Sequence, residues 1–198
     1  AGDGSAGTEV VKVTDQFNGA LLYNIQSFSN FSTLNVQMLG GSDNAVVTGR
    51  DDGTVGLVIN GGIDSLADSV TFTGVADAAD LFVVSNGSAG SATDVSVLRS
   101  GAAAFTNVSL VNIDAYTTDG GGGAGADAIQ VVTGAGTNTY GVSPASTTSG
   151  AINVNATPTL VYSNLGTGGS TVNLINDPLG GTTTAAGNFS GTAGADTY

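Results

Sequence analysis

The stretch GGAGADAIQVVTG, residues 122–134, decides how the rest of this sequence is interpreted. Small residues lead to a single acid, Asp127, and a mostly apolar run from Ile129 to Val132 follows it. Small residues with many glycines favour a turn, and a short β-branched run bounded by glycine favours a strand. The stretch therefore predicts a glycine-rich turn that enters a β-strand.

The same order of small residues, one acid and an apolar run recurs along the chain. The acids of these cassettes are Glu9, Asp43, Asp68, Asp127 and Asp196. Their spacing is uneven, so the chain carries a degenerate repeat. Such repeats are common in parallel β-solenoids, whose coils share a turn and an inward-facing stripe. The last cassette, GTAGADTY, stops where its strand should begin, and we expect the chain to be a segment of a longer repetitive protein.

Short apolar or alternating runs predict strands along the whole chain, at a spacing typical of sandwiches, barrels and solenoids. The predicted strands are Val10–Val13, Ala20–Ile25, Leu34–Leu39, Ala45–Thr48, Gly56–Ile59, Ser69–Thr73, Leu81–Val84, Val95–Leu98, Val108–Ile113, Ile129–Val132, Ala151–Val154, Leu160–Tyr162 and Thr171–Ile175. Helix formers are rare, and a helical turn is expected only at Asp64–Asp68 or Ala76–Asp80. We predict an all-β fold: residues 1–198 form one elongated domain, a right-handed parallel β-solenoid (β-helix) segment. The alternative is one or two immunoglobulin-like β-sandwich domains.

The composition restricts the function classes. Sixteen acids face only three bases (Lys12, Arg50 and Arg99), for a net charge of −13. Such a chain lacks the basic face that nucleic acids require, and it disfavours anionic membrane surfaces. The sequence contains no run of apolar residues long enough to span a bilayer. Without His or Cys, a Ser-His or Cys-His nucleophile is impossible.

A calcium site is the sharpest interpretation of the cassettes. GGAGADAIQ, residues 122–130, fits the nonapeptide G-G-x-G-x-D-x-U-x of calcium-binding β-rolls. That site needs tandem copies, and no second Asp follows at the right interval. The alternative is that each Asp closes its own turn through a local hydrogen bond. The candidate Ca²⁺ ligands are Asp127, Asp196, Asp43, Asp51 and Asp52.

Three stretches carry a resemblance to a known group of proteins: Leu66–Val84, Val111–Gly134 and Asn188–Tyr198. Their Asp cassettes and Val-Asn-Ile-type strands resemble the Gly/Asp/Asn-rich cell-surface proteins of bacteria, which include haemolysin-type calcium-binding repeat proteins, surface-layer proteins and adhesins. The resemblance implies extracellular structural or adhesive work.

We therefore expect a secreted, non-catalytic structural protein of the cell surface that binds copies of itself. It would serve as a subunit or segment of a surface layer, filament or adhesin, with Ca²⁺ as the stabilising ion and surface polysaccharide as a further partner. The alternative is a secreted polysaccharide-binding module or a polysaccharide-degrading β-helix enzyme. That alternative requires a cleft in which two acids lie beside an aromatic ring. Tyr116 with Asp114 and Asp119 is the best such group in the sequence.

Overall fold

The structure is a computed structural model that describes ten stretches of the chain. They are residues 10–14, 21–26, 33–48, 56–63, 65–86, 93–99, 108–133, 138–155, 158–176 and 185–189. All regular elements in these stretches are β-strands. The strands are β1 (Val10–Thr14), β2 (Leu21–Gln26), β3 (Thr33–Gln37), β4 (Asn44–Thr48), β5 (Gly56–Asn60), β6 (Ser69–Thr73), β7 (Asp80–Asn86), β8 (Thr93–Arg99), β9 (Val108–Val111), β10 (Ala115–Asp119), β11 (Ala128–Thr133), β12 (Asn138–Ser146), β13 (Ser149–Val154), β14 (Thr159–Ser163), β15 (Thr171–Asn176) and β16 (Ala185–Phe189).

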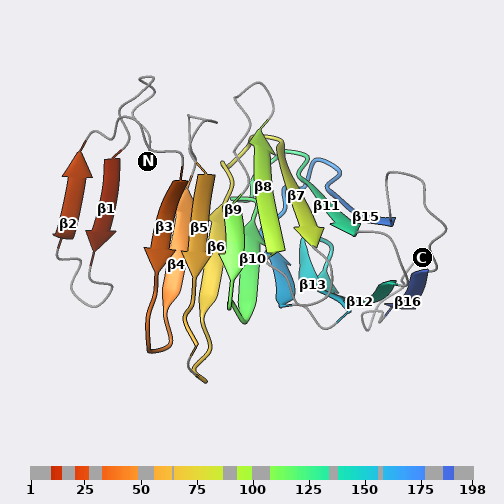
Figure 1. Cartoon of the computed structure of the whole chain (residues 1–198). Coiled ribbons are helices and arrows are strands. Elements are labelled where there is room, and N and C mark those ends of the chain that lie inside the picture. Colours follow the sequence, from red (N-terminus) through yellow and green to blue (C-terminus); the bar gives the residue numbers. More distant parts are fainter. Residues whose placement is uncertain are drawn as a thin grey trace.

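Two seven-stranded sheets make up most of the fold (Figure 1). The first, which we call sheet B, has the order β15-β11-β7-β8-β9-β5-β3, and the second, sheet C, has the order β16-β12-β13-β14-β10-β6-β4. From β3 to β7 the chain passes from one sheet to the other with each strand. β3 pairs in parallel with β5, β4 with β6, and β5 with β9. β1 and β2 form an antiparallel two-stranded sheet of their own.

Two antiparallel strands, β8 and β13, interrupt the parallel pairing of the sheets. β8 pairs antiparallel with both β7 and β9 in sheet B. β13 likewise pairs antiparallel with both β12 and β14 in sheet C. Both sheets remain open, with β3 and β4 at one end of the stack and β15 and β16 at the other (Figure 1).

The core lies between the two sheets and is built from in-register rows of side chains. In sheet C, Val70, Tyr116 and Leu160 share one row, and each is at most 1% exposed. In sheet B, Phe82 and Ile129 are neighbours in register and are both fully buried. Because parallel strands in register place like positions side by side, the alternating pattern of each strand extends through the core. Each fully buried Val, Ile or Phe contributes roughly 1.5–3 kcal/mol.

The all-β prediction is confirmed, and every predicted strand range overlaps an observed strand. The structure does not show a continuous parallel solenoid, because the sheets are mixed and open. It also differs from an immunoglobulin-like sandwich, whose sheets are antiparallel, because most pairs here are parallel. The two stretches allowed a helical turn are not helical where they are described: residues 65–66 form a bend, and residues 76–77 form a turn that leads into β7.

Candidate functional site

Aspartates at the entrances to the strands form a column across the turns that lead into sheet C. Asp43, Asp68 and Asp114 each directly precede a strand: β4, β6 and β10. The amide of Asp43 donates to Oδ1 of Asp68 over 2.9 Å, and the amide of Asp68 donates to Oδ2 of Asp114 over 2.9 Å. The carboxylates of Asp68 and Asp114 therefore each accept the amide of the preceding turn. We call these three residues the Asp43 column.

A second column runs across the turns that lead into sheet B. The amide of Asp80 donates to Oδ1 of Asp127, and the amide of Asp127 donates to Oγ of Ser170, each over 2.9 Å. Oδ2 of Asp127 accepts the amide of Gly166 over 2.7 Å, and Oδ2 of Asp80 accepts that of Val75 over 2.6 Å. We call Asp80, Asp127 and Ser170 the Asp127 column.

Both columns hold carboxylates away from water. Asp68 is 2% exposed, and Asp80 and Asp127 are each 1% exposed. Buried carboxylates are costly unless they accept hydrogen bonds. Here backbone amides of neighbouring turns are the donors, and hydrogen bonds to a charged acceptor are the stronger kind. The columns therefore tie together turns that lie far apart in the sequence.

Three glycines make room for these carboxylates. A Cβ on Gly61 would lie 2.5 Å from Oδ2 of Asp68, and a Cβ on Gly74 would lie 2.3 Å from Oδ2 of Asp80. A Cβ on Gly120 would lie 2.3 Å from Oδ2 of Asp127. Each glycine directly follows a strand. Its aspartate lies six or seven residues later, at the end of the turn that leads to the next strand. This glycine-to-aspartate spacing is the signal that would have revealed the columns in the sequence.

The predicted calcium ligands are not brought together. Asp43 and Asp127 belong to different columns, and each has a defined role in a turn. Asp51, Asp52 and Asp196 lie outside the described residues. Within the described stretches, no three acidic side chains converge in a way that could hold a metal ion. Asp68 and Asp114 were not among the predicted ligands, yet each of them accepts the amide of a neighbouring turn.

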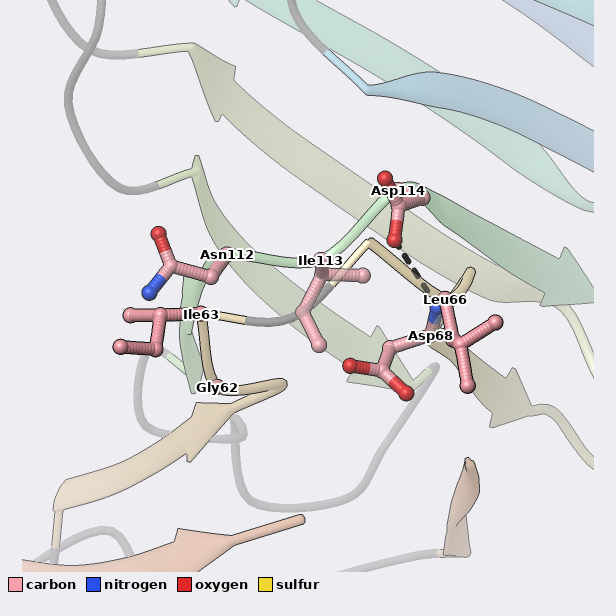
Figure 2. A pocket seen from close by; sticks show the side chains of 7 residues that line it. All are labelled: Gly62, Ile63, Leu66, Asp68, Asn112, Ile113 and Asp114. Carbon is pink, nitrogen blue, oxygen red and sulfur yellow. Dashed lines mark hydrogen bonds between the residues drawn. The ribbon is translucent and has the colours of Figure 1, made fainter. Parts of the chain in front are cut away.

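A pocket of about 400 Å³ opens at the turns before β6 and β10 (Figure 2). Asp68 and Asp114 lie at one side of it, and the dashed line in the figure is the hydrogen bond from the backbone amide of Asp68 to Oδ2 of Asp114. Ile63 is 99% exposed and Leu66 is 53% exposed, so apolar side chains stand in solvent at its rim. The described lining residues are Gly62, Ile63, Leu66, Asp68, Asn112, Ile113 and Asp114, and none of them is aromatic.

Tyr116 does not form the cleft that the polysaccharide alternative requires. Its side chain is 1% exposed and lies in the core, whereas Asp114 is exposed. Alternation explains the difference, because Tyr116 is an inward-facing position of β10 and Asp114 belongs to the turn before it.

The alkaline limit of stability should depend on this tyrosine. Burial raises the pKa of Tyr116 above its ordinary value and raises that of Tyr162 as well. Above about pH 10 the unfolded chain loses these phenolic protons while the folded chain keeps them, so stability falls as pH rises. We expect the free energy of unfolding, measured by denaturant titration, to fall less steeply above pH 10 in Tyr116→Phe, by about 1.4 kcal/mol per pH unit. Parallel curves for the two proteins would contradict this account.

Comparison with known proteins identifies no relative of this chain. The chain matches no family model, and neither a curated protein nor a solved structure matches it significantly. In the part of the chain that the structure describes, no helix is long and apolar enough to cross a membrane.

Proposed function

We propose that this protein is a non-catalytic structural protein of the cell surface that associates with copies of itself. The observation that carries the proposal is the composition of the outermost strands. β3 (TLNVQ), β4 (NAVVT), β15 (TVNLIN) and β16 (AAGNF) contain no charged residue and no proline. All four end their sheets within the described residues.

Open edges of this kind are a liability for a protein that stays monomeric. An edge strand presents a row of backbone N–H and C=O groups that can pair with another strand. Proteins usually guard such edges with lysines, other charges, prolines or bulges. The chain carries a net charge of −13, yet it places none of its charges on these four strands. Pairing with another copy would satisfy these edges.

The remaining parts of the proposal rest on the sequence and on the strand order. We propose that the fold is a solenoid interrupted by the β7–β8 and β12–β13 hairpins, because β3 to β6 alternate between two parallel-paired sheets. The resemblance to bacterial surface-layer and adhesin proteins supports an extracellular location. We propose that calcium acts as a counter-ion. With sixteen acids against three bases, copies of the chain repel each other at low salt, and a divalent cation reduces that repulsion.

A charge placed on one edge tests the proposal. Val46 lies on the outward face of β4 and is 61% exposed, so lysine fits there without loss of core packing. We expect the wild type to form larger species as its concentration rises in sedimentation velocity, with and without calcium. Val46→Lys should require at least about tenfold more protein for the same association, equivalent to about 1.4 kcal/mol.

Val161→Lys is the matched control. Val161 lies in the same outward row as Val46, through Thr71 and Thr117, but on the interior strand β14. It is 37% exposed, and its substitution adds the same charge to the same face. Association should remain at the wild-type level in this variant. A wild type that stays monomeric at every concentration, with calcium and with chelator, would overturn the proposed function.

A further inference from the structure

The two ends of the stack have the same strand direction. In sheet B, β3, β5 and β9 are parallel, and β7 is parallel to β9 because β8 is antiparallel to both. β11 and β15 are parallel to β7, so β15 points the same way as β3. The same reasoning through β12, β13 and β14 makes β16 parallel to β4. One end can therefore continue the parallel pairing of the other.

The register across sheet B also connects the two ends. Leu34 is level with Leu57, and Leu57 is level with Val108. Through β8 this level continues to Val84, then to Val131 in β11, and finally to Leu174 in β15. Apolar residues of β3, β5, β9, β7, β11 and β15 thus share one level, which begins at Leu34 and ends at Leu174. Both end residues are only partly buried and pack against the core from one side.

The Asp43 column has a direction of its own. The carboxylates of Asp68 and Asp114 each accept an amide from the turn before them along the stack. Asp43 is the first member of the column and precedes β4, the end strand of sheet C, so a turn added at that end would come directly before it. A neighbour that repeats the coil-to-coil relation would present a backbone amide at that position. A neighbour related by a two-fold axis would reverse either the strand direction or the two faces of the sheet, and it would not continue the column.

From these three features we infer that copies of this chain stack head to tail. β15 of one copy pairs in parallel with β3 of the next copy, β16 pairs with β4, and Leu174 lies beside Leu34 of the neighbour. This inference rests on the proposed self-association and specifies its partner surface and its polarity. The contact joins two different ends, and each added copy extends the two sheets in the same direction, so the expected product is an open filament and not a closed ring.

Cysteine trapping tests the polarity directly, because the chain contains no cysteine. Asn35 follows Leu34 and Ile175 follows Leu174, so both lie on the outward face at one common level. Neighbouring strands are about 4.8 Å apart, which is within the Cα separation that a disulfide spans. We would mix the single variants Asn35→Cys and Ile175→Cys under assembly conditions, oxidise them and identify the disulfides by mass spectrometry.

The expected product is a mixed dimer joined through positions 35 and 175, at least tenfold more abundant than either homodimer. Asn35→Cys mixed with Thr171→Cys is the matched control. Thr171 lies on the same strand and face as Ile175 but four residues away, about 13 Å along the strand, so we expect no mixed dimer there.

The remaining outcomes separate this inference from the proposed function. A predominant 35–35 or 175–175 disulfide would show symmetric pairing and would overturn the head-to-tail arrangement, although self-association would stand. If the wild type assembles but none of these disulfides forms in the cysteine variants, the contact lies elsewhere and the head-to-tail arrangement is overturned. A monomeric wild type would overturn the proposed function itself.

Discussion

Asp127→Ala should lower the free energy of unfolding by about 3–5 kcal/mol. The substitution removes the acceptor of two buried amides, those of Asp80 and Gly166. Each buried amide left without a partner costs about 1–3 kcal/mol, and the contact between neighbouring turns is lost as well. Chemical denaturation of the wild type and the variant under the same buffer conditions measures the difference.

Asp119→Ala is the control for this prediction. Asp119 also accepts two hydrogen bonds, from the amide of Gly121 and from Nδ2 of Asn164, but both lie in contact with water. Water can replace the lost carboxylate there, so we expect a loss of less than about 1 kcal/mol. Equal losses in the two variants would show that the burial of Asp127 contributes nothing to its role.

Gly120→Ala should destabilise the protein by about 3 kcal/mol, through overpacking. Its Cβ would lie 2.3 Å from Oδ2 of Asp127 and 2.9 Å from the backbone oxygen of Asn164. Asp127 cannot swing aside without breaking its bonds to the amides of Asp80 and Gly166. The steric conflict must therefore be relieved by movement of the turn itself. Thermal and denaturant unfolding of the variant measure the cost.

Gly122→Ala is the control that separates the cost of steric overlap from the cost of an unfavourable backbone conformation. Gly122 has a φ of +73°, but nothing lies within 4 Å of an added Cβ. Its substitution should cost about 1–2 kcal/mol, the penalty of a left-handed conformation alone. The double variant Gly120→Ala/Asp127→Ala should be less than additive by at least about 1 kcal/mol, because loss of the carboxylate relieves the overlap. Strict additivity would contradict the contact between these two positions.

Strand positions could be predicted because they depend on local pattern. Runs such as Ser69–Thr73 alternate apolar and polar residues and end at glycine, and the structure places β6 at those residues. β10, β12 and β16 were not predicted. AYTTD has only one large apolar residue, while NTYGVSPAS and AAGNF contain glycine or proline, which lower strand propensity. These strands form because their neighbours supply register and burial.

Two strands end close to residues with a left-handed backbone conformation, which the apolar pattern of the sequence did not reveal. The predicted strand Leu34–Leu39 ends earlier, at Gln37, and Leu39 has a φ of +64°. The predicted strand Val108–Ile113 ends at Val111, and Asn112 has a φ of +52°. Asparagine tolerates that conformation, which makes the second boundary the more predictable of the two.

The sequence by itself determined the β-class, the positions of most strands and the turn-forming character of GGAGADAIQ, because propensity and periodicity act within a few residues. Only the tertiary structure decided what Asp127 does. Its hydrogen-bond partners come from turns 39 and 47 residues away in the chain, and parallel stacking brings these turns into contact. The equal direction of β3 and β15 was likewise decided by β8, which pairs antiparallel with both β7 and β9, since strand direction depends on which strands pair across the whole sheet.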